Sequence, residues 1–367
     1  MTAFLREYLK KIRSSLSNDF DDNYDEARFG SKPAETKKAY LKSLIKDLRR
    51  YLGLELDCAS WGLPELSWLY EKLIDAESRK TLVDIIAYRG LGHRKIKLAN
   101  NSPKYWENLR LAESLVDKSV EPLTRFKHFD IMKMDLNKIG YPIKIFYSPL
   151  GALIGYIEQQ YRCGAGDFTV ECGEGDFVID AGGCWGDTAL YFAAKTGKNG
   201  KVYSFEFLPF NLDIFRRNLD LNPDLKKTID LIEAPLWSEA GQDIPIIANG
   251  PGTRLVASDK AASAGEISFR TEAIDRLVEV GKITKVDFIK MDIEGAELRA
   301  LKGAEQAIRR FKPKLAITVY HSLQDFWEIP KYIDSLCLGY QFSLRHFTIH
   351  AEETVLFAMA SKSENLP

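Results

Sequence analysis

The stretch FVIDAGGCWGDT at residues 177–188 decides the fold of this chain. Its apolar start predicts a buried strand that ends at Asp180, and its glycines turn the chain into a helix that begins near Asp187. A second apolar stretch, KVYSF at 201–205, ends in Glu206. A strand, a glycine turn and a helix N-terminus build the nucleotide pocket of open α/β sheets, and an acid after the neighbouring strand suits the two hydroxyls of a ribose.

The spacing of the glycines separates two classes of cofactor. A dinucleotide site has the pattern G-x-G-x-x-G with its first glycine directly after the strand, so that the backbone can wrap a pyrophosphate. Here Asp180 stands at the strand end and the glycines are fewer. This pattern suits a ligand with a positive charge and no phosphate, and S-adenosylmethionine is such a ligand. The residues expected to bind it are Asp180, Gly182, Gly183, Gly186, Asp187 and Glu206.

Four blocks of sequence follow the pattern of one family. They are VIDAGGCWGDTALYFA (178–193), VYSFE (202–206), TEAIDRL (271–277) and VDFIKMDIEGAELRALKGA (286–304). Together they resemble the FkbM-type S-adenosylmethionine-dependent methyltransferases. The last block is the most specific, since it follows the strand, acid and helix pattern of the family almost residue for residue. The chain departs from the family at Gly183-Cys184, where Ala-Asn is usual, and at Phe207, where a proline is usual.

The resemblance implies a class I methyltransferase fold, a Rossmann-like α/β architecture with a doubly wound, mainly parallel sheet and a C-terminal antiparallel hairpin. The runs 341–347 and 354–359 fit that hairpin, because the turn between them is too short for a crossover helix. Parallel strands are expected at residues 177–181, 202–206, 229–233, 286–291 and 314–320. Three regions are expected: a helical N-terminal region (1–120), a linker and cofactor-covering segment (121–165) and the methyltransferase domain (166–361).

Before the first sheet strand the chain reads as mainly helical. Apolar residues at three- and four-residue spacings predict helices over 34–52, 64–88 and 103–120. The aspartate-rich stretch 18–29 is expected to be a solvated loop or arm. A short helix is expected at 150–161. In the resembling family this segment covers the cofactor, which makes Tyr156 and Glu158 candidates for ligand contact as well as for packing.

Composition and charge limit the classes of partner and location. The 51 basic and 52 acidic residues give a formal charge of −1, which offers no reason to expect nucleic acid or an anionic membrane as partner. No apolar stretch approaches the ~18 residues of a membrane span, and the start of the chain lacks the apolar core of a signal peptide. Five cysteines without a C-x-x-C pair argue against a disulfide framework and a zinc site. The expected location is the cytoplasm.

Further site candidates follow the later strands. Asp292 follows the apolar stretch 286–289, so we expect it at the carboxyl edge of the sheet, beside the glycine loop and the transferable methyl group. Glu294 and Glu297 are weaker candidates, because the helix dipole alone favours acids in a first turn. Trp237 follows the third strand, where such folds hold the adenine. It is expected either to stack on that ring or to belong to the core.

The candidates for substrate binding and proton transfer lie in two loops. The turn 249–254 is a hairpin turn or a substrate loop. His321 directly follows the fifth strand, where it would take a proton from an attacking hydroxyl or cap the next helix. With the hydroxyl or amide acceptor that the resemblance implies, His321 or Asp292 is the expected proton acceptor. No metal site is expected.

The sequence therefore predicts a methyltransferase that moves a methyl group from S-adenosylmethionine to a small-molecule or sugar acceptor, at an oxygen atom. Positioning would supply most of the catalysis, because the leaving thioether needs no proton. One alternative is a non-catalytic module that binds a nucleoside ligand or a protein. A nicotinamide-dependent oxidoreductase is disfavoured by the missing glycine pattern. The fold does not fix the acceptor, and the oligomeric state is not predicted.

Overall fold

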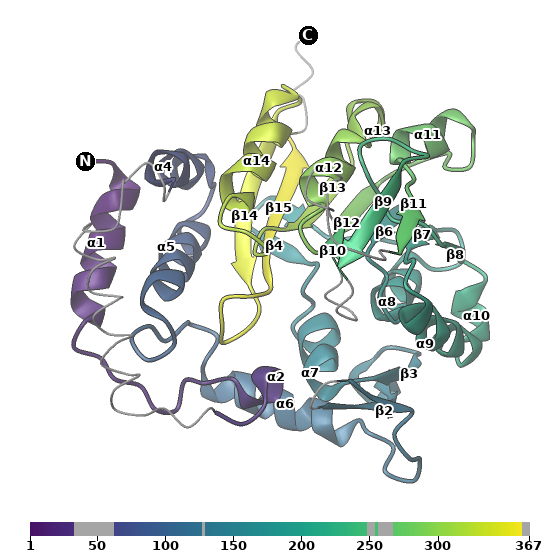
Figure 1. Cartoon of the computed structure of the whole chain (residues 1–367), viewed down its shortest axis with the longest axis horizontal. Coiled ribbons are helices and arrows are strands. Elements are labelled where there is room, and N and C mark those ends of the chain that lie inside the picture. Colours follow the sequence, from purple (N-terminus) through teal and green to yellow (C-terminus); the bar gives the residue numbers. More distant parts are fainter. Residues whose placement is uncertain (33–61, 127–128, 248–253, 256–266, 362–367) are drawn as a thin grey trace.

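A seven-stranded sheet forms the centre of the molecule (Figure 1). The computed structural model describes residues 1–32, 62–126, 129–247, 254–255 and 267–361. The strand order is β14-β15-β13-β12-β6-β7-β8. The strands are β6 (Phe177–Ala181), β7 (Lys201–Phe205), β8 (Ile229–Ile232), β12 (Phe288–Met291), β13 (Lys314–Thr318), β14 (Tyr340–His346) and β15 (Thr354–Ala360). The five strands from β13 to β8 are parallel, while β15 is antiparallel to both β13 and β14. This topology confirms the expected fold, including its terminal hairpin.

Helices cover both faces of the sheet. They are α1 (Ala3–Ser15), α2 (Glu26–Phe29), α4 (Leu63–Lys72), α5 (Ala76–Leu91), α6 (Pro103–Ser114), α7 (Pro149–Ala152), α8 (Asp187–Thr196), α9 (Pro209–Asp220), α10 (Pro223–Lys226), α11 (Ile274–Glu279), α12 (Glu297–Lys302), α13 (Glu305–Phe311) and α14 (Asp325–Ser335). Residues of α1, α4, α5 and α11 to α14 fill one hydrophobic cluster, and residues of α6 to α9 fill the other. Along β6, Ile179 belongs to the first cluster and Val178 to the second, because successive strand residues point to opposite faces.

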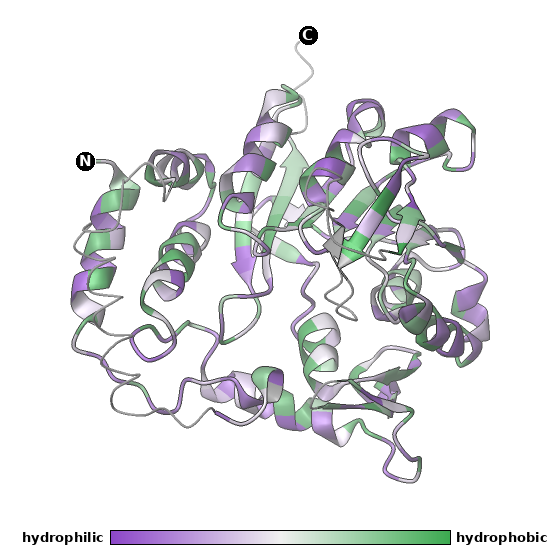
Figure 2. Cartoon of the chain, viewed as in Figure 1, coloured by the Kyte–Doolittle hydropathy of each residue, from purple (hydrophilic) through white to green (hydrophobic). Residues whose placement is uncertain are grey.

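The pattern of burial explains why the central strands read as continuous apolar runs. All four residues of β12 are buried, and four of the five in β6 are. Strands in the middle of a parallel sheet are covered on both faces and therefore do not alternate between apolar and polar residues. Figure 2 shows the same division: apolar residues dominate the sheet, and the helices around it carry hydrophilic residues outward. Among the described helices, none is long and apolar enough to cross a membrane.

Among the N-terminal helices, α5 packs directly on β14, while α1 packs on α4 and α5. The expected helix over 64–88 is broken, because Leu73 takes an extended conformation and the Ile74 N–H donates to the Phe342 carbonyl at 3.0 Å. Asp75 then begins α5 by accepting a hydrogen bond from the Ser78 N–H. The helix expected from 103 ends at Ser114, and the one expected over 34–52 lies outside the described residues.

The stretch 18–29 is a loop up to α2, as expected, with Asp21 and Asp22 exposed, but it is not a free arm, because other residues anchor it to the fold. Asn23 is fully buried, and its amide donates to the carbonyls of His93 and Ile96, both at 2.6 Å. Arg28 pairs with Glu352 at 2.7 Å and Glu353 at 3.0 Å. These partners lie far away in the sequence, so part of the polarity of the stretch serves buried hydrogen bonds and ion pairs that could not be foreseen.

Smaller sheets surround the central one. One is antiparallel and consists of β1 (Thr124–Phe126), β2 (Phe129–Asp135) and β3 (Lys144–Tyr147). A hairpin joins β4 (Cys163–Ala165) to β5 (Phe168–Val170), and β9 (Asp243–Ile247) pairs with β10 (Arg254–Leu255) and β11 (Ser268–Arg270). The short helix expected at 150–161 is split into α7 and a π-helical turn at Leu153–Ile157. The three expected regions stay a prediction.

Candidate active site

A pocket opens at the carboxyl ends of β6, β7 and β12. Its lining includes Gly182, Cys184, Glu206, Leu208, Asn211, Asp292, Ile293 and Glu294. Because β6 lies between β7 and β12, Glu206 and Asp292 stand on opposite sides of Gly182. Ligands of open α/β sheets bind at this edge. Three of the residues expected to bind a cofactor therefore share one cavity.

The three glycines are required by close packing at the turn after β6. Gly182 has φ +84°, and a Cβ there would clash with the carbonyl oxygen of Asp292. A Cβ at Gly183 would clash with the Ser204 hydroxyl, and one at Gly186, with φ +82°, would lie 2.9 Å from the Phe215 ring. Only glycine accepts this combination of positive φ and close contact without strain. The turn is thereby held against β12 on one side and α9 on the other.

Asp180 supports the turn from within. Its carboxylate is fully buried, accepts hydrogen bonds from Thr188 Oγ1 at 2.8 Å and Ser204 Oγ at 2.7 Å, and pairs with Lys290 Nζ at 3.1 Å. The same Nζ donates to the carbonyl of Gly182 at 2.7 Å. Asp180 does not line the pocket. It would therefore support ligand binding indirectly, by holding the glycine turn in place.

Lys290 was missed in the sequence, although a signal for it existed. It interrupts the buried strand β12 and lies directly beside Asp180 in the parallel register of β12 and β6. Burial lowers the pKa of Lys290, but the carboxylates of Asp180 and Asp292 outweigh burial and raise the pKa above its ordinary value. The ammonium is therefore charged at neutral pH. The positive charge of Lys290 balances the negative charges of Asp180 and Asp292.

Glu206 stands at the end of β7 in a fixed orientation. Its carboxylate accepts hydrogen bonds from the N–H groups of Phe207 at 2.6 Å and Leu208 at 2.8 Å and from Asn211 Nδ2 at 3.0 Å. The residue is 6% exposed, and burial raises the pKa of its carboxyl group. A carboxylate has about four lone-pair positions, so one of the two oxygens still has room for a ligand hydroxyl.

Asp187 lies at the first residue of α8 and has an unsatisfied oxygen. Tyr147 donates to its Oδ2 at 2.7 Å, while its buried Oδ1 has no hydrogen-bond partner. Burial raises the pKa of Asp187 to about 6. Burial also raises the pKa of the Cys184 thiol, and the carboxylates of Asp187 and Glu206 raise it further, so both acids lie close to this lining residue. Asp187 therefore lies near the pocket with one carboxylate oxygen that has no hydrogen-bond partner.

The raised pKa of Asp187 predicts a specific pH dependence of stability. The pKa of Asp187 is higher in the folded protein than in the unfolded chain, so folding favours the protonated carboxyl group. This contribution to stability is fully present below pH 4 and is lost as the pH rises through 6. Asp187→Asn should therefore gain about 3 kcal/mol in free energy of unfolding relative to the wild type between pH 4 and pH 7. Urea unfolding of both proteins across this range measures the difference. A difference that does not change with pH would show that Asp187 has an ordinary pKa.

The remaining cofactor candidates pack away from the pocket. Trp237 lies under the Arg299 guanidinium at 5.6 Å and clusters with Ile244 and Ala296, which favours the core interpretation over adenine stacking. Tyr156 donates to the Asp187 carbonyl at 2.7 Å, and Glu158 accepts from Asn108 at 2.6 Å. Their contacts with a ligand stay predictions. Most of the turn 249–254 lies outside the described residues.

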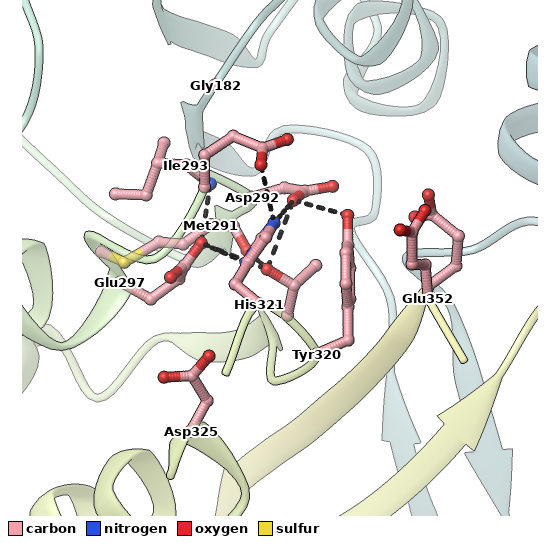
Figure 3. A network of polar contacts seen from close by, with 12 residues as sticks. Gly182, Met291, Asp292, Ile293, Glu297, Tyr320, His321, Asp325 and Glu352 are labelled. Carbon is pink, nitrogen blue, oxygen red and sulfur yellow. Dashed lines mark hydrogen bonds and ion pairs between the residues drawn. The ribbon is translucent and has the colours of Figure 1, made fainter. Parts of the chain in front are cut away.

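Asp292 and His321 meet at the other end of the pocket (Figure 3). Asp292 accepts hydrogen bonds from the hydroxyls of Tyr161 and Tyr320, both at 3.1 Å. The His321 ring is 3% exposed, and its Nε2 lies 3.5 Å from Asp292 Oδ1. Asp292 thus lines the pocket directly, while His321 lies behind it.

Carboxylates surround the His321 ring. Its Nε2 also lies 3.6 Å from Glu294 Oε2, and its Nδ1 lies 3.2 Å from Glu297 Oε1. Burial lowers the pKa of His321, but the three carboxylates outweigh it and raise the pKa to about 10. Burial raises the pKa of Glu294 to about 7. For Glu297, burial also raises the pKa, but the charge of His321 holds it below its ordinary value.

The surroundings of His321 weigh against its expected role as a base, which stays a prediction. With its pKa raised to about 10, the ring is protonated at neutral pH unless a cation takes the place of that proton, so it does not readily accept the proton of a hydroxyl. It does not cap α14 either, since Ser322 Oγ accepts the hydrogen bond from the Asp325 N–H at 3.2 Å. Asp292 stays the predicted proton acceptor among the two residues.

The fold is that of the class I methyltransferases. Residues 163–344 match the family model described as the methyltransferase FkbM domain. This part of the chain is therefore an FkbM methyltransferase domain, which confirms the resemblance.

Two relatives show the extent of the similarity. The hexuronic acid methyltransferase AglP of Haloferax volcanii is 32% identical over 112 residues, which are 29% of this chain and 43% of that protein. The crystal structure of methyltransferase FkbM from Methylobacillus flagellatus KT aligns with a TM-score of 0.50 and 22% identity, over 81% of this chain and 58% of that one. At this identity the likeness shows the fold. The chain spans about half the length of either relative.

Proposed function

We propose that this protein transfers a methyl group from S-adenosylmethionine to an oxygen atom of a sugar or a similar small hydroxylated molecule. The observation that carries the proposal is the pocket in which Gly182, Glu206 and Asp292 meet at the carboxyl edge of the sheet. Family membership of residues 163–344 supports methyl transfer, and the name of the Haloferax volcanii relative supports a sugar as the acceptor.

The residues around the pocket fit this cofactor. Gly182 lets the turn lie against the carbonyl oxygen of Asp292, where no side chain fits, and Glu206 has an acceptor position left for a ribose hydroxyl. The unpartnered Oδ1 of Asp187 suits the ammonium group of the ligand. When bound, the cofactor supplies a methyl group on a positively charged sulfur.

The protein contributes positioning. Asp292 and Glu294 place carboxylate oxygens on the side of Gly182 opposite Glu206, where they would orient an acceptor hydroxyl toward the methyl group. In this arrangement Asp292 would hold the hydroxyl proton, while the enclosed Lys290 keeps the acids behind the turn balanced. The non-catalytic alternative is not favoured, because the pocket keeps acids on both sides of an open glycine turn.

The direct test is methyl transfer from radiolabelled S-adenosylmethionine to a panel of acceptors. The panel contains neutral hexoses, amino sugars and hexuronic acids, each free and as a glycoside. We expect label in at least one sugar class, with Asp292→Asn slower by about 10²-fold or more if the residue holds the proton. Transfer to none of the sugars, but to an amine or a nucleic acid, would overturn the proposed acceptor.

Glu206 gives a test of the cofactor site alone. Glu206→Gln removes the charge that would strengthen the ribose hydrogen bonds, so the Kd for S-adenosylmethionine should rise about 10- to 150-fold. The matched control is Glu233→Gln, which also follows a sheet strand but pairs with Arg216 on the surface. Calorimetry on both variants measures the effect. Equal affinities in the two variants would place the ribose elsewhere.

The cellular location and the class of the acceptor are also part of this proposal. We keep the cytoplasm as the proposed location because of the cysteine usage, and a small molecule rather than nucleic acid as the acceptor because of the balanced charge.

A further inference from the structure

Three side chains with metal-ligand chemistry gather at the carboxyl ends of β12 and β13. Asp292, Glu297 and His321 each offer one ligand atom, and these atoms lie within 4.8 Å of one another. Asp292 directly follows β12, Glu297 is the first residue of α12, and His321 lies in the loop after β13. Figure 3 shows the His321 ring between the two carboxylates, with Glu297 beside one ring nitrogen and Asp292 beside the other.

The hydrogen bonding of this group is incomplete. His321 is 3% exposed, yet neither of its ring nitrogens has a hydrogen-bond partner, and the buried Glu297 Oε2 has none. Buried polar atoms in folded proteins nearly always have a partner. The ring nitrogens instead face carboxylate oxygens at 3.2 Å and 3.5 Å. One ion takes one ring nitrogen, and ligand atoms about 2.1 Å from it lie roughly 3.0–4.2 Å from one another. One nitrogen of His321 and one oxygen each of Asp292 and Glu297 lie within 4.8 Å, so a small side-chain adjustment would bring them to that spacing.

The charge of the group calls for a cation. Asp292, Glu294 and Glu297 surround one imidazole, so the carboxylates exceed the positive charge even when the ring is protonated. The nearby Lys290 is already paired with Asp180. Buried charge without compensation is costly. A divalent ion would balance the carboxylates better than a single proton does.

We propose that Asp292, Glu297 and His321 bind a divalent transition-metal ion of the Mn²⁺ type. One imidazole nitrogen with two carboxylates is a donor set that such ions accept, whereas Ca²⁺ and Mg²⁺ prefer oxygen alone. This assignment replaces the expectation that the chain has no metal site. The cluster was hidden in the sequence because its members come from three separate elements.

The place of the ion indicates its use. Asp292 lines the pocket, so an ion on its carboxylate would lie at the pocket wall and could take an acceptor hydroxyl as a further ligand. A metal ion lowers the pKa of a bound hydroxyl, which would supply the activation that the enclosed His321 ring cannot. This use rests on the proposed methyl transfer, whereas binding of the ion does not.

The test is titration of metal-free full-length protein with Mn²⁺ alone, without cofactor or acceptor. Free Mn²⁺ is counted by electron paramagnetic resonance, and heat is measured by calorimetry. We expect one ion per chain with a Kd in the micromolar range. Glu297→Gln and His321→Gln should each weaken binding at least tenfold. Absence of binding below millimolar Mn²⁺, or equal affinity in both variants and the wild type, would overturn the proposal.

Two controls keep the outcome decisive. Asp325→Asn changes a neighbouring acid outside the three-residue group, and its Mn²⁺ affinity should match that of the wild type. Circular dichroism and thermal unfolding check each variant, and if His321→Gln does not fold, the nearly isosteric Glu297→Gln decides. S-adenosylmethionine binding is measured on the same samples. In the wild type, absence of Mn²⁺ binding with intact cofactor binding rejects the metal site only, and Mn²⁺ binding without cofactor binding rejects the proposed function only.

Discussion

Gly182→Val is expected to abolish S-adenosylmethionine binding, with no heat detected at millimolar ligand. Gly182 has φ +84°, and its missing side chain leaves room for the carbonyl oxygen of Asp292 on one side and the pocket on the other. A branched side chain would strain the turn and, because it would meet the Asp292 backbone, would push the turn away from β12 and distort the pocket. Calorimetry measures the loss, and circular dichroism checks that the sheet is still formed.

The control for this variant is Gly175→Val. Gly175 also has a positive φ, +81°, but a Cβ there meets no atom within 4 Å. Its backbone cost is similar, while the pocket stays untouched, so its affinity should match that of the wild type. Gly182→Ala adds a smaller side chain and should give an intermediate or complete loss. If Gly182→Val binds within threefold of the wild type, the ligand does not lie at this turn.

Lys290→Met is expected to lower the free energy of unfolding by about 3–5 kcal/mol, because it leaves a buried carboxylate without its partner. The Lys290 ammonium lies 3.1 Å from Asp180 Oδ1 and also donates to the Ala181 carbonyl at 3.1 Å. Both side chains of the pair are at most 1% exposed, so water cannot replace the lost charge. Urea unfolding at pH 7 measures the loss.

Two further variants separate the charge from the packing. Lys290→Met combined with Asp180→Asn removes both charges and should recover at least half of the lost free energy of unfolding. Lys201→Met breaks a pair with Asp230 at the sheet surface and should cost at most about 1 kcal/mol. A loss below 1 kcal/mol for Lys290→Met would mean that Asp180 is not held charged in the folded protein.

The strands were predictable because their signals are local. The stretch 177–181 is observed as β6 within the same bounds, and the stretch expected at 202–206 is β7 at Lys201–Phe205. Apolar runs of four or five residues that end in glycine or an acid predict buried strands without any knowledge of distant contacts. The terminal hairpin was equally predictable, since the turn between its strands leaves no length for a helix.

Features that depend on distant contacts were not predictable. Leu73 breaks a helix because the next residue bonds to Phe342 on β14, and nothing near Leu73 in the sequence indicates this. The buried Asn23 reads as a surface residue until its partners at His93 and Ile96 are known. Local propensity is a weak guide wherever tertiary contacts override it.

The residues of the candidate site also fall into a group that local sequence predicts and a group that depends on distant contacts. The turn at Gly182 and the acid at Glu206 belong to short motifs, so their positions could be expected before the fold was seen. The charge state of His321 could not, because it depends on three carboxylates that the neighbouring strands β12 and β13 bring around it. A histidine at a strand end looks like a base in the sequence, and its environment decides otherwise.

The measurement that tests the central claim most directly is calorimetric titration of the wild-type chain with S-adenosylmethionine and, separately, with NAD. The pocket between Glu206 and Asp292 predicts one S-adenosylmethionine per chain with a micromolar Kd and no heat with NAD. Binding of NAD, or no binding of S-adenosylmethionine by protein that is folded by circular dichroism, would contradict the account.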